Sequence, residues 1–140
     1  MPGLEGAGQV VREWIAKAEE DLKAAAHILK LGRSCPTAAV CFHAQQCAEK
    51  YLKAYLVSQA IAFPKTHKIQ ELVLLTPAKA RPSISLEEQL LLSNYAAGPR
   101  YPGWREVPLP EARLPASLLL ASYSWLPYPE GISRAKPWRG

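Results

Sequence analysis

The chain has 140 residues, a length that suits one domain able to bury a core without disulfides or a structural metal. Apolar residues make up 49% and charged residues 21%, which excludes an intrinsically disordered protein. The formal net charge is +5, which favours an anionic partner such as RNA, a nucleotide or an acidic protein. Since the sequence contains neither a membrane-spanning apolar run nor a signal-peptide pattern, we expect a cytoplasmic protein.

Two long amphipathic helices are predicted in the first half of the chain. Apolar residues recur every three or four positions from Gln9 to Leu31, and Gly32 is expected to end that helix. Pro36 suits a first helical turn, and helical spacing then continues through Gln59. Two long helices joined by about four residues must pack antiparallel to bury their apolar stripes.

Two shorter helices are predicted next, each with a start signal. Thr66 is the predicted N-cap of a helix that contains the apolar stripe of IQELVLL and ends before Pro77. Ser85 and Glu88 have the spacing of a capping box, and the helix that they start is predicted to reach Ala96.

The C-terminal part is predicted to hold a fifth helix over residues 111–125, followed by an extended or mobile tail over 127–140 that is rich in proline and glycine. No strand pattern or internal repeat is evident. We therefore predict an all-α fold, an antiparallel up-and-down bundle of four to five helices, with residues 1–126 as one domain.

The stretch CFHAQQCAEKYLKAYL, residues 41–56, raises the question of a metal site. Zinc needs converging ligands, but on a helix Cys41 and His43 project from nearly opposite sides, and only His43 and Cys47 are roughly aligned. A cysteine on an apolar stripe has a raised pKa and is a poor nucleophile. We predict no metal and no cofactor, and three reduced structural cysteines, because Cys35 is the only other one and no CxxC pair is present.

The polar residues of this stretch have two interpretations. Gln46, Glu49, Lys50 and Lys53 suit a solvated helix face, with a favourable pair between Glu49 and Lys53 four residues apart. The same residues are candidates for binding an anionic ligand.

Motifs along the chain resemble those of a known family. They are Trp14 with Ala18, Asp21-Leu22 and Ala25, then FHAQQCAEKYLKAYL, then His67 before IQEL, then Tyr95 and the RYPG of Arg100–Gly103. Together they resemble the HEPN domain (higher eukaryotes and prokaryotes nucleotide-binding) over roughly residues 10 to 126. The resemblance implies a small antiparallel helical bundle that commonly forms homodimers. It also implies a frequent partner, a minimal nucleotidyltransferase encoded alongside as a toxin–antitoxin or two-subunit pair.

Many members of that family are ribonucleases with an Arg-x4–6-His motif, in which the arginine holds the phosphate and the histidine performs acid–base chemistry. This chain departs from the motif. Arg100, Arg105 and Arg113 have no histidine downstream, because His67 is the last histidine in the sequence. We therefore predict no catalytic residues, and the sequence favours a protein that is not an enzyme.

The residues that resemble the family are still predicted to bind the phosphate of a nucleotide or RNA. The predicted ligand-binding residues are Lys50, Lys53, Lys65, His67, Arg100 and Tyr101, and Gln46 and Glu49 are predicted to lie behind them and hold them in place. Arginine can donate two hydrogen bonds to phosphate and tyrosine can stack on a base. Plainer interpretations stay open: His67 as a capping or packing residue, and Arg100 with Tyr101 as a rigid turn between two prolines.

Three functions follow from these patterns. The first is a non-catalytic, nucleotide-binding partner of a minimal nucleotidyltransferase. The alternative is a ribonuclease toxin in which His67 or His43 replaces the missing histidine. The third is a structural oligomer with Phe42 in its subunit interface. A single asparagine and thirteen prolines also suggest a thermophilic source, since thermolabile amides are few and loops are stiff in such proteins.

Overall fold

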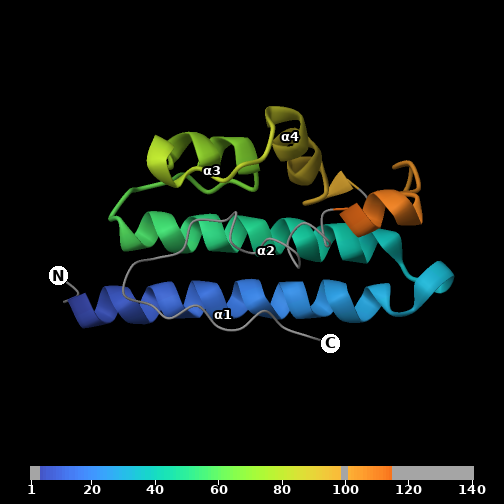
Figure 1. Ribbon diagram of the computed structural model, residues 1–140, viewed down its shortest axis with the longest axis horizontal. Coiled ribbons are helices and arrows are strands. Elements are labelled where there is room, and N and C mark those ends of the chain that lie inside the picture. The colour runs from blue at the N-terminus through green and yellow to red at the C-terminus, as the bar shows by residue number, and fades with distance from the viewer. Residues whose placement is uncertain (1–3, 99–100, 115–140) are drawn as a thin grey trace.

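The computed structural model describes residues 4–98 and 101–114, which fold into an all-α helical bundle without a strand in these ranges (Figure 1). Its elements in chain order are α1 (Leu4–Leu29), a 3-10 turn (Gly32–Ser34), α2 (Thr37–Ser58), α3 (Ile69–Leu75), a 3-10 turn (Ala78–Ala80) and α4 (Leu86–Asn94). Residues 109–114 are helical as well. The predicted fold class is confirmed.

The two long helices form an antiparallel hairpin (Figure 1). Gly32 takes a φ of 63°, which glycine adopts without steric cost, and the chain reverses there as predicted. Five of the six apolar positions in the predicted stripe of α1 are at most 6% exposed, namely Val11, Ile15, Ala18, Leu22 and Ala25, whereas Leu29 at the end of the helix is partly buried. Ala44 and Ala48 of α2 are fully buried, and such small side chains allow the two helix backbones to approach closely.

Helix α2 is the central element of the bundle, because α3 and α4 pack on the side of α2 that faces away from α1 (Figure 1). Thirteen of its 22 residues are buried, far more than a helix with one covered face requires. The two short helices are tied to each other at Ser93, whose Oγ accepts from the backbone N–H of Ile69 at 2.8 Å and donates to Gln70 at 2.5 Å.

The expectation that the polar side of α2 is solvated is wrong for its C-terminal half. The side chains of Glu49 and Lys53 are only 4% and 10% exposed, whereas that of Lys50 is 22% exposed. The segment from Gln59 to Lys68 and the start of α3 cover this side of the helix. The predicted pair between Glu49 and Lys53 is present at 3.3 Å, but it is buried.

The helix caps follow the sequence signals in one case and not in the other. Ser85 caps α4 through the predicted box, accepting from the Glu88 N–H at 3.1 Å while the Glu88 carboxylate accepts from the Ser85 N–H at 3.0 Å. The prediction of Thr66 as the N-cap of α3 is wrong, because the helix begins at Ile69 and Lys68 is its N-cap. The Thr66 hydroxyl instead accepts from the Lys68 N–H at 3.1 Å, which closes a turn before the helix.

Helix boundaries elsewhere differ by a few residues from the predictions. Helix α1 begins at Leu4 rather than Gln9, and α4 ends at Asn94 rather than Ala96. The start of the predicted fifth helix is helical, but residues 115–125 and the predicted tail over 127–140 lie outside the described residues. Within the described part of the chain, every helix is too short or too polar to cross a lipid bilayer.

Candidate functional site

An open pocket of about 540 Å³ lies between the C-terminal half of α2, the N-terminal half of α1 and the segment that connects α2 to α3. It is lined by Trp14, Lys53, Phe63, Pro64, Lys65, Thr66 and His67. Three of the residues predicted to bind phosphate, Lys53, Lys65 and His67, therefore share one cavity. The pocket combines a cationic side with an apolar wall.

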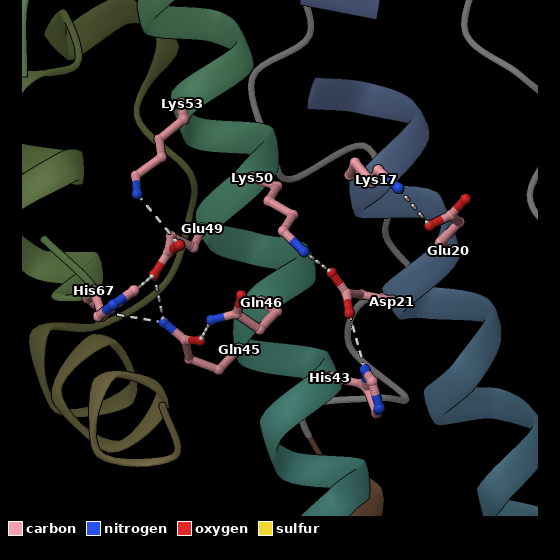
Figure 2. Close-up of polar contacts among 10 residues, drawn as sticks. All are labelled: Lys17, Glu20, Asp21, His43, Gln45, Gln46, Glu49, Lys50, Lys53 and His67. Carbon is pink, nitrogen blue, oxygen red and sulfur yellow. Dashed lines mark hydrogen bonds and ion pairs between the residues drawn. The ribbon is translucent and has the colours of Figure 1, made fainter. Parts of the chain in front are cut away.

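His67 is fixed in the pocket by a buried carboxylate. Its Nδ1 lies 2.8 Å from Oε1 of Glu49, 18 residues away on α2, as Figure 2 shows. The imidazole is 71% exposed, whereas Glu49 is only 4% exposed. Because the carboxylate accepts a hydrogen bond from the Nδ1–H, the ring presents Nε2 to solvent, as an acceptor when neutral and as a donor when protonated.

Gln45 holds both members of this pair in place. Its fully buried side-chain amide donates to Oε1 of Glu49 at 3.2 Å and to the backbone carbonyl of His67 at 2.9 Å. The amide of Gln46 in turn donates to Oε1 of Gln45 at 2.7 Å (Figure 2). The backbone and the side chain of His67 are thus both anchored to α2, which preorganises the imidazole.

The ammonium group of Lys53 is confined between two aromatic rings. Its Nζ lies 5.7 Å from the ring centroid of Trp14 and 5.8 Å from that of Phe63, both within the range of cation–π attraction. Its charge is paired with Oε2 of Glu49. An ammonium group has three N–H donors, so donors remain for a ligand that enters the pocket.

The opposite flank of α2 carries a second polar cluster (Figure 2). Asp21 of α1, 11% exposed, accepts from Nζ of Lys50 and lies 2.8 Å from Nδ1 of His43. These contacts link α1 to α2. Lys50 was predicted to bind a ligand together with Lys53, but the two lysines lie on different flanks of the helix and pair with different carboxylates.

Tyr101 lies at the other end of α2 from the pocket. The orange segment of Figure 1, to which it belongs, lies beside the N-terminal end of α2. Near Cys41, the Tyr95 hydroxyl donates to Glu111 at 2.8 Å, and Arg105 donates to both carboxylate oxygens of Glu111 at 2.6 and 2.8 Å. Twelve helical residues, about 18 Å, separate position 41 from position 53. Tyr101 is 62% exposed. Arg100 lies outside the described residues.

The polar contacts at that end change the acidity of the groups involved. The guanidinium of Arg105 donates to Glu111 and lowers the pKa of that carboxyl. Burial and the hydrogen bond to Glu111 raise the pKa of the Tyr95 hydroxyl. Burial also raises the pKa of the Cys41 thiol to about 12, with a further contribution from the negative charge of Glu111. These groups form a structural cluster that attaches the segment after α4 to the core.

A family model of the HEPN domain matches residues 11–114, about three quarters of the chain. The chain belongs to the HEPN family. Membership indicates a function in nucleotide binding or in RNA cleavage. The searches of curated proteins and of solved structures returned no significant match.

The cysteines of this HEPN protein are core residues, as predicted. Cys35, Cys41 and Cys47 are all free and buried, and burial raises the pKa of the Cys47 thiol well above its ordinary value. The raised pKa values of the Cys41 and Cys47 thiols exclude a ready thiolate nucleophile at these two positions. Among the described residues, no three His, Cys, Asp or Glu side chains converge in a way that would hold a metal ion.

Three residues of the site were not among those predicted to bind a ligand, although Trp14 and Gln45 belong to the HEPN-like motifs. Trp14 and Phe63 form the apolar wall, and Gln45 carries the hydrogen-bond network. Trp14 has a sequence signal, because it is a large aromatic residue beside the apolar stripe of α1. Phe63 has no such signal, since its role depends on where the connection after α2 runs. Gln45 was passed over because it is an uncharged neighbour of the charged residues, and its role depends on the connection before α3, where the His67 carbonyl accepts from its amide.

Proposed function

We propose that this HEPN protein is a non-catalytic nucleotide-binding module, and that its pocket between α1, α2 and the connection to α3 holds the phosphate and the base of a nucleotide or of an RNA. The observation that carries the proposal is the meeting of Lys53, Lys65 and His67 with the rings of Trp14 and Phe63 in one cavity. Cationic donors suit phosphate and aromatic rings suit a base. The net charge of +5 favours such an anionic ligand.

A binding titration tests this function. Purified protein is titrated by calorimetry with nucleoside monophosphates and with a short RNA carrying a 5′-phosphate. The variant Lys65→Ala removes an exposed cation from the pocket, and Lys79→Ala removes an exposed cation from the 3-10 turn Ala78–Ala80. We expect affinity to fall at least fivefold in Lys65→Ala and to stay unchanged in Lys79→Ala. The absence of binding to every ligand would contradict the function.

The proposal extends to protein partners, on the basis of family membership. In this interpretation the chain is a cytoplasmic homodimer that pairs with a minimal nucleotidyltransferase in a toxin–antitoxin type of system. Co-purification with a nucleotidyltransferase from a neighbouring reading frame supports the pairing, and separate elution contradicts it. Light scattering of Phe42→Asp tests the dimer, because Phe42 is only half-buried and a charge there would disrupt an interface at this face of α2.

RNA cleavage is the second candidate function, and the contact between His67 and Glu49 is the observation that favours it. A carboxylate on Nδ1 leaves Nε2 as the atom that can accept the proton of a ribose 2′-hydroxyl. Incubation with labelled RNA in the presence of a chelator tests this function. Cleavage should then be lost in His67→Ala and kept in His43→Ala, whose histidine pairs with Asp21 on the other flank of α2. Uncut RNA contradicts the candidate.

A further inference from the structure

We infer that the pocket is selective for a single nucleotide unit that ends in one phosphomonoester, a nucleoside monophosphate or the phosphorylated end of an RNA. The inference rests on the proposed nucleotide-binding function and adds to it the class of ligand. It follows from four properties of the pocket: its size, its supply of cations, its lack of a free carboxylate and its aromatic wall.

The size of the pocket admits one nucleotide. Its volume of about 540 Å³ falls within the range of roughly 300–1,000 Å³ that is typical of small-molecule sites. The cavity is formed by a single short connection across two helices, and its lining residues come from positions 14, 53 and 63–67 only. A second base would have to lie outside this lining.

The cations of the pocket match one phosphate group. Lys65 is exposed, and no carboxylate partner of its ammonium group occurs in the described ranges. Lys53 shares Glu49 with His67, so these three residues together carry a net charge between zero and +1, depending on the imidazole. With Lys65 the pocket offers a charge of +1 to +2. A terminal phosphate carries about −1.5 to −2 at neutral pH, whereas a phosphodiester carries only one negative charge.

The pocket does not provide for a triphosphate with its magnesium ion. Mg²⁺ in nucleotide sites is held by one or two carboxylates in addition to the phosphates. None of the described residues that line the pocket is acidic. Glu49 lies behind them and both of its oxygens already accept hydrogen bonds, Oε1 from Gln45 and His67 and Oε2 from Lys53. Extra phosphates would therefore add charge that no group in the pocket neutralises.

The aromatic wall provides for one base. Trp14 and Phe63 are only partly buried, so ring surface remains accessible, and Pro64 extends the apolar wall between Phe63 and Lys65. Stacking on aromatic side chains tolerates any base, because every base has a π face. The same two rings flank the Lys53 ammonium, which places the apolar wall next to the cation. Base and phosphate are thus recognised a short distance apart, as in a mononucleotide.

A comparison of ligands tests the inference on the full chain by calorimetry. AMP and UMP represent a purine and a pyrimidine monophosphate. Adenosine lacks the phosphate, the dinucleoside monophosphate ApA presents only a diester, and ATP with Mg²⁺ presents a polyphosphate. We expect AMP or UMP to bind at least tenfold more tightly than each of the other three. Lys65→Ala should remove most of this preference over adenosine, whereas Lys79→Ala should not.

The outcomes separate this inference from the function on which it rests. Equal or tighter binding of ApA or of Mg·ATP would overturn the selectivity and leave nucleotide binding intact. If none of the nucleotides binds, the proposed function itself is contradicted.

Phe63→Leu supplies a second variant, which keeps an apolar side chain in the wall and removes the ring. This variant should lower the affinity for AMP at least fivefold and leave the affinity for inorganic phosphate unchanged. An unchanged AMP affinity would overturn the role of the aromatic wall.

Discussion

Nδ1 of His67 lies 2.8 Å from Oε1 of Glu49, so a histidine that is 71% exposed is held by a carboxylate that is 4% exposed. The same carboxylate is paired with Lys53, whose side chain is 10% exposed. A carboxylate in such a place is costly to bury alone, and the Lys53 ammonium together with the hydrogen bonds from His67 and Gln45 offsets that cost. Glu49 therefore connects the stability of α2 to the geometry of the pocket.

The first prediction concerns the removal of this buried charge. Glu49→Gln leaves the ammonium group of Lys53 buried without its counter-ion, and breaking a buried pair in this way costs about 3 kcal/mol. We expect the free energy of unfolding, measured by urea denaturation, to fall by roughly that amount. The same variant should weaken nucleotide binding, because glutamine keeps only one of the two oxygens that now accept separately from His67 and Lys53, so the two side chains can no longer both be held as they are.

Glu20→Gln is the matched control for Glu49→Gln. The pair between Lys17 and Glu20 on α1 is exposed, with side chains 66% and 70% accessible, and exposed pairs contribute at most about 0.5 kcal/mol. The identical chemical change should then leave the unfolding curve almost unmoved. Equal losses of stability in Glu20→Gln and Glu49→Gln would contradict the buried role of Glu49.

The sequence predicted the hairpin of α1 and α2 well, because helical periodicity identifies which residues a helix buries against one neighbour. It did not predict that α2 is covered on two sides. Glu49 and Lys53 have the spacing of a solvated pair, and only the path of the segment from Gln59 to Lys68 makes them buried. That path depends on tertiary packing and leaves no periodic signal.

The second prediction concerns thiol reactivity. The pKa of the Cys41 thiol is raised to about 12 and that of Cys47 is raised as well, in both cases mainly by burial, and alkylation requires the thiolate. At about pH 8, iodoacetamide should therefore leave both cysteines unmodified in the native protein over a time that fully labels glutathione. In concentrated urea both should be labelled, as peptide mass spectrometry can show. Rapid labelling of either cysteine in the native state would contradict the result.

The candidate site was predictable in part. Lys53 from the motif on α2 shares the pocket with Lys65 and His67, because the connection after α2 folds back across the C-terminal half of that helix. Lys50 and Tyr101 belong to the same set of motifs but lie elsewhere. A motif shows which residues occur together along the chain. It does not show on which flank of a helix, or at which end of the bundle, each residue lies, because that depends on the packing of the whole fold.

The third prediction concerns stability in acid. Hydrogen bonds from Arg105, and secondly from Tyr95, lower the pKa of the Glu111 carboxyl in the folded protein. A group with a lowered folded pKa stabilises the protein fully above its unfolded pKa, about 4.5 for this carboxyl, and loses that contribution as the pH falls through the folded value. Glu111→Gln should therefore be less stable than the wild type at neutral pH, with a difference that shrinks below about pH 4.

Thermal unfolding across this pH range checks the Glu111 prediction. Glu87→Gln is the control, because Glu87 is an exposed residue of the first turn of α4 and lies outside the cluster of Tyr95, Arg105 and Glu111. Its melting temperature should keep a nearly constant offset from that of the wild type below pH 7. A constant offset for Glu111→Gln as well would contradict the link between its charge and stability.

The fourth prediction concerns Ala60, which lies two residues beyond the end of α2 at Ser58 and has a φ of 54° in the left-handed region. The Ala60 N–H donates to the carbonyl of Val57 at 3.0 Å and the Ile61 N–H to that of Leu56 at 2.9 Å, the two bonds of a Schellman motif whose left-handed position is normally glycine. The left-handed conformation costs an alanine about 1–2 kcal/mol, against about 0.5–1 kcal/mol of extra chain entropy for glycine. Ala60→Gly should therefore raise the free energy of unfolding, measured by urea denaturation, by about 0.5–1 kcal/mol. The control is Ala16→Gly, at an exposed position inside α1, which should lower it by a similar amount. Destabilisation by both substitutions would show that the left-handed turn after α2 does not strain Ala60.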